Sequence, residues 1–213
     1  MSDDFNYDVI QDYLTSLVPH RPAEMLEMEK YAEENGFPII GPSAGHACYL
    51  IARMIGAKNI FEMGSGYGYS TAWFARAVRE NGGGMVHHVV WDETLSQMAR
   101  RHLSVLGYDD IVRYTVGEAM ETLRNTAGQF DLIFNDIDKE AYPESLVLIK
   151  QRLYTGGVLI ADNLLWHARI FDPADRDTST EAIRFFTKQV TSDPDLITTI
   201  LPIRDGVLVA FKK

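Results

Sequence analysis

The chain has 213 residues, 46% of them hydrophobic, so it is long enough for one well-cored α/β domain with little left for a second. Its 30 acidic and 20 basic residues give a formal net charge of −10, which argues against a nucleic-acid-binding surface. The single cysteine, Cys48, excludes an intramolecular disulfide, and no apolar run approaches the roughly 20 residues that span a bilayer, so we expect a cytoplasmic protein with no membrane partner.

The N-terminal part of the chain is predicted to be helical. Residues 4–35 have the pattern of two amphipathic helices, of which the second opens at Pro22 and stops at Asn35-Gly36. We therefore expect residues 1–35 to form a helical extension of a single domain that covers residues 1–213.

Strand and helix patterns alternate through the rest of the chain. Strands are predicted at 58–62, 85–90, 111–116, 131–135, 157–161, 196–202 and 206–211. Helix starts are predicted from the capping residues Ser43, Asp92 and the pair Thr178/Glu181. Arg204-Asp205-Gly206 is a hairpin signal. This order implies a Rossmann-like α/β fold, with a seven-stranded, mostly parallel sheet, one antiparallel strand and helices on both faces.

A glycine-rich loop follows the first predicted strand. Glu62 precedes Gly64, Gly66 and Gly68, and a helical pattern begins directly after them. Small residues at a strand-to-helix turn let the backbone approach a ligand closely. The spacing G-x-G-x-G differs from the G-x-G-x-x-G of dinucleotide sites. It resembles the first motif of class I S-adenosylmethionine-dependent methyltransferases.

Polar residues also follow two later strands. Asp136 ends one strand with Lys139 three residues on, and Asp162-Asn163 ends the next. If these strands are parallel neighbours, their ends lie about 4.8 Å apart and the three oxygen-bearing side chains converge. Two carboxylates and an amide oxygen suit Mg²⁺ or Ca²⁺ better than zinc. Singly, each residue could be a helix cap, a turn residue or a solvated lysine, but together they favour a site.

At these motifs the chain resembles the small metal-dependent O-methyltransferases, the group that contains the catechol and caffeoyl-coenzyme A enzymes and many bacterial relatives. The resemblance covers residues 37–213 and rests on EMGSGYGYS, NDIDKEAY, GGVLIADNLLW and LPIRDGVLVAFKK. It implies S-adenosylmethionine and Mg²⁺, or another divalent cation, as cofactors. It also implies that the metal ligands are Asp136, Asp162 and Asn163, and that Lys139 is the base that takes the hydroxyl proton of the acceptor.

The resemblance further implies where the cofactor binds. The predicted contacts are Glu62, Gly64, Gly66, Gly68, Ser70, Trp91, Asp92, Glu118, Ala119 and Asp136. One position departs from the family pattern, because Val90 stands where an acid usually binds the ribose hydroxyls. A valine side chain cannot accept those hydrogen bonds. Asp92, two residues on, is a candidate substitute that would have to reach back, and Trp91 is a candidate either for stacking on adenine or for the core.

The function predicted from the sequence is methyl transfer to a catechol-like small molecule with vicinal hydroxyls, by a homodimeric enzyme. A tRNA hydroxyuridine O-methyltransferase is an alternative, against which the net charge counts. A methyltransferase-fold binding or assembly protein without transfer activity is another, supported by Val90. A nicotinamide dehydrogenase is disfavoured by the missing G-x-G-x-x-G.

Overall fold

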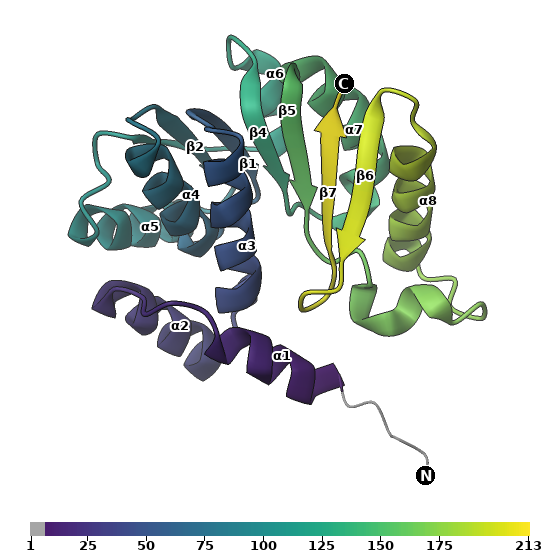
Figure 1. Cartoon of the computed structure of the whole chain (residues 1–213), viewed down its shortest axis with the longest axis horizontal. Coiled ribbons are helices and arrows are strands. Elements are labelled where there is room, and N and C mark those ends of the chain that lie inside the picture. Colours follow the sequence, from purple (N-terminus) through teal and green to yellow (C-terminus); the bar gives the residue numbers. More distant parts are fainter. Residues whose placement is uncertain (1–6) are drawn as a thin grey trace.

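In a computed structural model, which describes residues 7–213, the chain forms one seven-stranded sheet in the order β3-β2-β1-β4-β5-β7-β6 (Figure 1). The strands are β1 (Asn59–Met63), β2 (Met85–Val90), β3 (Val112–Val116), β4 (Phe130–Asn135), β5 (Leu153–Ala161), β6 (Leu196–Leu201) and β7 (Val207–Lys212). The pairs among β1 to β5 are parallel, and β7 runs antiparallel between β5 and β6. The predicted Rossmann-like α/β fold is confirmed.

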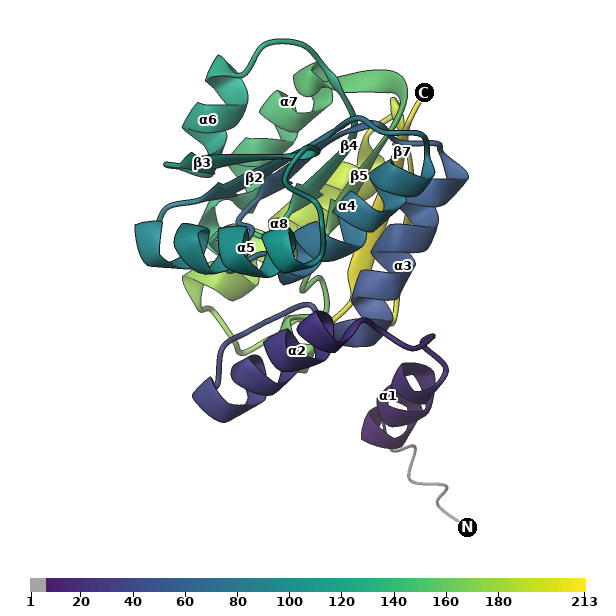
Figure 2. The same cartoon turned by 90° about the vertical axis from the view of Figure 1, so that its left-hand side faces the viewer.

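Helices cover both faces of this sheet (Figure 2). The α-helices are α1 (Tyr7–Ser16), α2 (Ala23–Asn35), α3 (Gly41–Met54), α4 (Tyr69–Glu80), α5 (Glu93–Val105), α6 (Ala119–Asn125), α7 (Tyr142–Arg152) and α8 (Thr178–Ser192). The 3-10 helices are η1 (Lys139–Ala141) and η2 (Trp166–Phe171). One core lies between the sheet and α3, α4 and α5, and the other between the sheet and α6, α7 and α8. Because the central strands are buried on both faces, their sequences are largely apolar, although β1 contains the buried Glu62 and β2 the buried His87 and His88.

Several predicted boundaries differ from the observed ones. The third helix begins at Gly41, with Pro42 in its first turn, so Ser43 lies inside the helix and does not cap it. The last long helix is capped by Asp177, whose carboxylate accepts a hydrogen bond from Ser179 N at 3.0 Å, rather than by Thr178. Residues 4–6 of the first predicted helix lie outside the described residues.

The fifth strand begins at Leu153 rather than at residue 157. Gly156 has φ +86°, and the pairing register shifts between Phe130 and Leu132 on the neighbouring strand. These irregularities interrupt the strand pattern in the sequence, which therefore resembles a loop at this point.

The N-terminal helices α1 and α2 lie near the end of the sheet at which the parallel strands terminate (Figure 1). In open α/β sheets this is the end where ligands bind. None of the helices in residues 7–213 combines the length and the apolar character needed to cross a membrane.

Candidate active site

A cavity of about 610 Å³ opens at the carboxyl ends of the parallel strands. Its wall consists of the glycine-rich loop after β1, the ends of β2 and β3, the segments after β4 and β5, residues 37–40 and the β6–β7 hairpin. Small-molecule sites in proteins commonly measure about 300–1,000 Å³. The cavity is therefore large enough for a cofactor-sized ligand.

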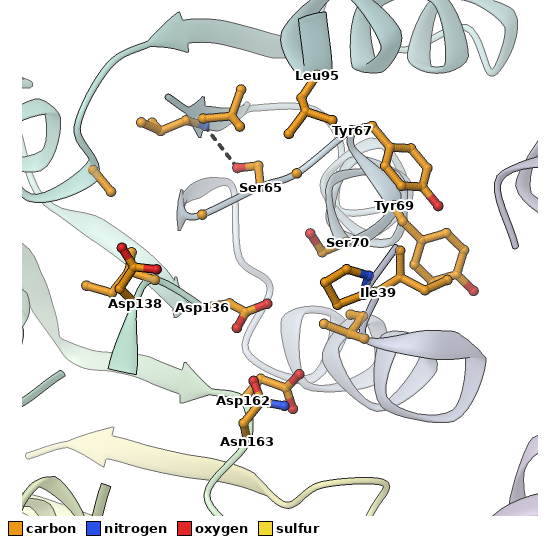
Figure 3. A pocket seen from close by; sticks show the side chains of 18 of the residues that line it. Ile39, Ser65, Tyr67, Tyr69, Ser70, Leu95, Asp136, Asp138, Asp162 and Asn163 are labelled. Atoms are coloured by element: carbon orange, nitrogen blue, oxygen red, sulfur yellow. Dashed lines mark hydrogen bonds between the residues drawn. The ribbon is translucent and has the colours of Figure 1, made fainter. Parts of the chain in front are cut away.

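The glycine-rich loop is held against both neighbouring strands. Gly64 has φ +83°, and a Cβ at this position would collide with the main-chain oxygen of Asp136. The hydroxyl of Ser65 accepts a hydrogen bond from Val89 N at 2.9 Å (Figure 3). Only glycine fits at position 64, because the backbone there approaches β4 closely in a left-handed conformation.

Seven of the ten predicted cofactor residues line the cavity: Gly64, Gly66, Ser70, Trp91, Glu118, Ala119 and Asp136. Glu62, Gly68 and Asp92 lie off its wall. Gly68 gives room for close packing against α5, and the carboxylate of Asp92 caps that helix by accepting from Leu95 N at 2.9 Å. Asp92 is thus engaged in capping rather than reaching back toward the ribose position.

The adenine end of the predicted cofactor site is lined by Val90, Trp91 and Glu118. Val90 is the last residue of β2, whereas the Trp91 side chain is 80% exposed and does not belong to the core. Both carboxylate oxygens of Glu118 accept hydrogen bonds, from Met120 N at 2.8 Å and Glu121 N at 2.6 Å, at the start of α6. This capping orients Glu118 through the backbone of the helix that follows.

Glu62 is fully buried behind the glycine-rich loop. Neither of its carboxyl oxygens has a well-formed hydrogen bond. Burial raises the pKa of Glu62 to about 7, and the nearby hydroxyls of Ser70 and Thr71 offset part of that rise. Glu62 is therefore poised to take or release a proton near neutral pH.

Two carboxylates line the cavity wall (Figure 3): Asp162, which is buried, and Asp136, whose side chain is 29% exposed. Asp136 follows β4 and Asp162 follows β5, and the last residues of these two strands are paired, which confirms that the strands are parallel neighbours. Burial and the charge of Asp136 raise the pKa of Asp162 to about 7. Asp162 Oδ1 is buried and has no hydrogen-bond partner. The pair thus carries negative charge that the surrounding protein only partly compensates.

Asn163 lies beside this pair with φ +64°, a conformation that asparagine tolerates better than most residues. Its amide nitrogen donates a hydrogen bond to Asp205 Oδ2 at 3.2 Å. The amide oxygen is therefore the end that remains to accept from a ligand or to coordinate a cation.

Lys139 lies on the same wall and is nine-tenths buried. Its Nζ donates to Asp136 Oδ1 at 2.8 Å, to Tyr142 Oη at 3.0 Å and to Ile137 O at 3.3 Å. Tyr142 Oη in turn donates toward the main-chain oxygens of Asn135 and Asp162, at 2.9 and 3.1 Å. Lys139 is thus held between the carboxylate pair and a buried tyrosine.

The donor set fits a hard divalent cation. Asp136, Asp162 and Asn163 present oxygen atoms at one rim, and the unpartnered Oδ1 of Asp162 is a buried acceptor without a donor. Within residues 7–213, no three His, Cys, Asp or Glu side chains are grouped for metal binding. A cation here would therefore depend on the amide oxygen of Asn163 and on oxygens of a ligand or water.

Several parts of the wall were not predicted from the sequence. Phe37 and Ile39 come from the segment before α3, Tyr67 from the glycine-rich loop, and Arg204 and Asp205 from the β6–β7 hairpin. The hairpin motif was visible in the sequence, but its position over the cavity follows from β7 inserting beside β5.

The chain is similar to known proteins over nearly its whole length. The family model for O-methyltransferases matches residues 20–213. A catechol O-methyltransferase from Niastella koreensis is 27% identical over 218 residues, which cover 97% of this chain and 98% of that protein.

Two solved structures share the fold over nearly the whole chain. The O-methyltransferase from Bacillus cereus in complex with SAH has a TM-score of 0.86 at 25% identity, and covers 96% of this chain and 97% of its own. The O-methyltransferase TomG from Streptomyces achromogenes in complex with SAM has a TM-score of 0.86 over 100% of both chains. At 23% identity, this second likeness concerns the fold alone.

Proposed function

The chain belongs to the O-methyltransferase family, and from this premise we propose that it is a divalent-cation-dependent member that methylates a catechol-like acceptor with vicinal hydroxyls. Family membership makes it an S-adenosylmethionine-dependent O-methyltransferase. The observation that carries the finer proposal is the pair of carboxylates, Asp136 and Asp162, beside Lys139 at the wall of a cofactor-sized cavity.

The transfer forms a bond between the acceptor oxygen and the methyl carbon while the bond from that carbon to the sulfonium sulfur breaks. The proton of the acceptor hydroxyl must leave, and in this proposal Lys139 Nζ accepts it after losing one of its own protons to solvent. The ammonium formed on Nζ has acceptors already in place, Asp136 Oδ1 and Ile137 O. Because the sulfonium charge disappears during the reaction, the protein mainly aligns the two reactants.

In this proposal the cation is held by Asp136, Asp162 and Asn163. When bound, it would act as a Lewis acid that lowers the pKa of the acceptor hydroxyls and orients them. The catechol O-methyltransferase from Niastella koreensis supports an acceptor of this class. The raised pKa of Asp162 also supports the proposal, since a cation would stabilise the carboxylate that burial disfavours.

The proposal is tested first by titrating S-adenosylmethionine into the folded protein by calorimetry, with Mg²⁺ and then with a chelator. Catechol-type acceptors are then screened for methylation. We expect saturable cofactor binding, and activity that the chelator abolishes. Activity that persists in the chelator would remove the cation from the proposal, and absence of cofactor binding in both conditions would leave a methyltransferase fold used for binding or assembly.

Lys139→Met tests the proposed base. Loss of a general base typically costs about 10²- to 10⁴-fold in rate, so we expect kcat to fall by that factor while cofactor affinity stays near the wild-type value. Lys188→Met, at an exposed lysine on α8, is the matched control. A Lys139 variant that is folded and turns over at the wild-type rate would exclude Lys139 as the base.

A further inference from the structure

One carboxylate of the β6–β7 turn contacts the cavity from a segment remote in sequence from the proposed ligands. Asp205 Oδ2 accepts a hydrogen bond from Asn163 Nδ2 at 3.2 Å, and Asp205 Oδ1 accepts one from His167 N at 2.6 Å. The Asp205 side chain is 16% exposed, so both bonds are largely shielded from water. A single side chain thus contacts both the proposed ligand Asn163 and the loop beyond it.

The first bond determines how the Asn163 amide is oriented. An ionised carboxylate only accepts hydrogen bonds, so Asp205 can pair only with the amide NH₂ and never with the amide oxygen. The oxygen of Asn163 must then occupy the opposite end of the planar group, on the cavity wall with Asp136 and Asp162. If the amide turned over, it would present NH₂ there, which cannot coordinate a cation.

The second bond holds an unusual stretch of backbone. Asn163, Trp166, His167 and Ala168 all have φ between +47° and +64°, and none of them is glycine. A left-handed non-glycine residue costs about 1–2 kcal/mol and persists only where its surroundings hold it. Three main-chain contacts with the turn do so: His167 N to the carboxylate of Asp205, Leu165 N to Asp205 O at 2.8 Å, and Leu164 N to Gly206 O at 3.0 Å.

The turn itself is held from its other side by α1. Tyr7 Oη donates to Arg204 O at 2.7 Å and to Pro202 O at 3.0 Å, while Gln11 Oε1 accepts from Arg204 N at 2.6 Å. The guanidinium of Arg204 also donates to Ile39 O on the cavity wall. Asp205 therefore projects from a backbone that is fixed at both ends.

We propose that Asp205 is a positioning residue of the transfer site, whose carboxylate turns the amide oxygen of Asn163 toward the cation and holds the 163–168 segment in place. The inference rests on the proposed function, because it assumes a cation held by Asp136, Asp162 and Asn163. Partners that orient metal ligands in this way typically change metal affinity by about 10- to 100-fold when they are removed.

Asp205→Asn separates positioning from folding. The new amide oxygen can still accept from His167 N, which leaves its NH₂ facing the NH₂ of Asn163 and drives Asn163 to turn over. We expect Mn²⁺ and Mg²⁺ affinity, measured by calorimetry, to fall about 10- to 100-fold. Cofactor affinity in chelator and the melting temperature in chelator are expected to stay near wild type, and saturating cation should restore much of kcat.

Asp109→Asn is the matched control, because it removes the same charge at an exposed position just before β3, at the opposite end of the strands from the cavity. Asp205→Ala, which removes both bonds, is expected to lower the melting temperature in addition. The positioning role is overturned if folded Asp205→Asn binds Mn²⁺ as tightly as wild type and Asp109→Asn. A wild-type protein that binds the cofactor but no divalent cation would instead overturn the proposed cation dependence, and the Asp205 role with it.

Discussion

Val90 is the residue at which this chain departs from the pattern of the proteins it resembles. It ends β2, is 4% exposed and lines the cavity, at the position where the resemblance predicts an acid that accepts from the ribose hydroxyls. Asp92 does not line the cavity, and one of its carboxylate oxygens caps α5. We therefore expect cofactor affinity to come from the remaining walls, including the exposed indole of Trp91.

Val90→Glu should consequently tighten cofactor binding. Hydrogen bonds to a charged group contribute about 1.5–3 kcal/mol, so we expect roughly a tenfold or greater gain in S-adenosylmethionine affinity by calorimetry. Without cofactor the new carboxylate is buried and unpaired, so the melting temperature should drop and the shift caused by cofactor should grow. Val90→Leu adds volume without an acceptor and should give no gain. A folded Val90→Glu protein with unchanged affinity would place the ribose elsewhere.

Glu62 introduces a pH dependence at the scale of one side chain. Its pKa rises from 4.5 to about 7 on folding, so between these values the unfolded chain is ionised while the folded chain holds the proton. The folded state then binds more protons, and its stability falls as pH increases through this window. Above about pH 7 the folded state carries the whole free-energy cost of an ionised, buried Glu62, on the order of 3 kcal/mol.

Glu62→Gln removes this titration. Relative to wild type, the variant should gain free energy of unfolding as pH rises from about 4.5 to about 7, and the difference should be constant outside that window. Urea denaturation at pH 5 and at pH 8 measures the effect, and only the change between the two values matters. A difference between the two proteins that is independent of pH would show that Glu62 is ionised throughout.

At the scale of elements, α3 and α4 pack closely against each other. A Cβ on Gly45 would collide with the indole of Trp73, whose Nε1 is buried without a hydrogen-bond partner. Gly45 thus lets two helices approach until the ring of one lies on the backbone of the other. The cost is a glycine in a helix interior, about 1 kcal/mol relative to alanine.

Gly45→Ala should destabilise the fold despite its better helix propensity, since overpacking typically costs about 1–3 kcal/mol. Trp73→Phe creates space at the same contact, so the double variant should be more stable than the sum of the single effects indicates. Thermal denaturation of the four proteins measures this coupling, with Leu50→Ala on the exposed side of α3 as control. Additive effects would mean that the indole moves away freely.

The local order of elements was largely predictable from the sequence, whereas contacts made across the fold were not. The proximity of Asp136 and Asp162 could be predicted, because the carboxyl ends of neighbouring parallel strands lie at the same edge of a sheet. The proposed role of Asp205 could not be predicted from the sequence, because it depends on β7 inserting between β5 and β6. The same holds for Tyr67, whose hydroxyl donates to Met28 O on α2 at 2.8 Å.

Residue composition misleads at caps for a related reason. Ser43 and Thr178 are both good capping types, yet Gly41 and Asp177 mark where their helices begin. The residue at which a helix starts depends on the position and direction of the chain segment that precedes it. A four-residue capping pattern contains no information about that segment. Val90 differs from these caps, because the sequence alone showed that it departs from the family pattern. The structure adds that Val90 lines the cavity.

At the scale of the whole molecule, apolar side chains of β6 and β7 are exposed on one face of the sheet. Ile197 on β6 and Phe211 on β7 are directly paired and are 59% and 40% exposed. Their side chains lie on the same face of the sheet as Val207, which belongs to the core that α3 covers. On α3, Leu50 and Met54 are also exposed. Apolar surface of this kind commonly marks an interface between copies of one chain.

We therefore expect a homodimer that buries the paired side chains of β6 and β7. Light scattering should give twice the chain mass of 24.0 kDa at micromolar concentration. Ile197→Lys combined with Phe211→Lys should yield a folded monomer, because charges at an interface core are costly to bury. Phe185→Lys, at a 55% exposed position on α8 over the opposite face, should leave the dimer intact. A wild-type monomer would contradict the dimer, and a double variant that stays dimeric would move the interface to another face.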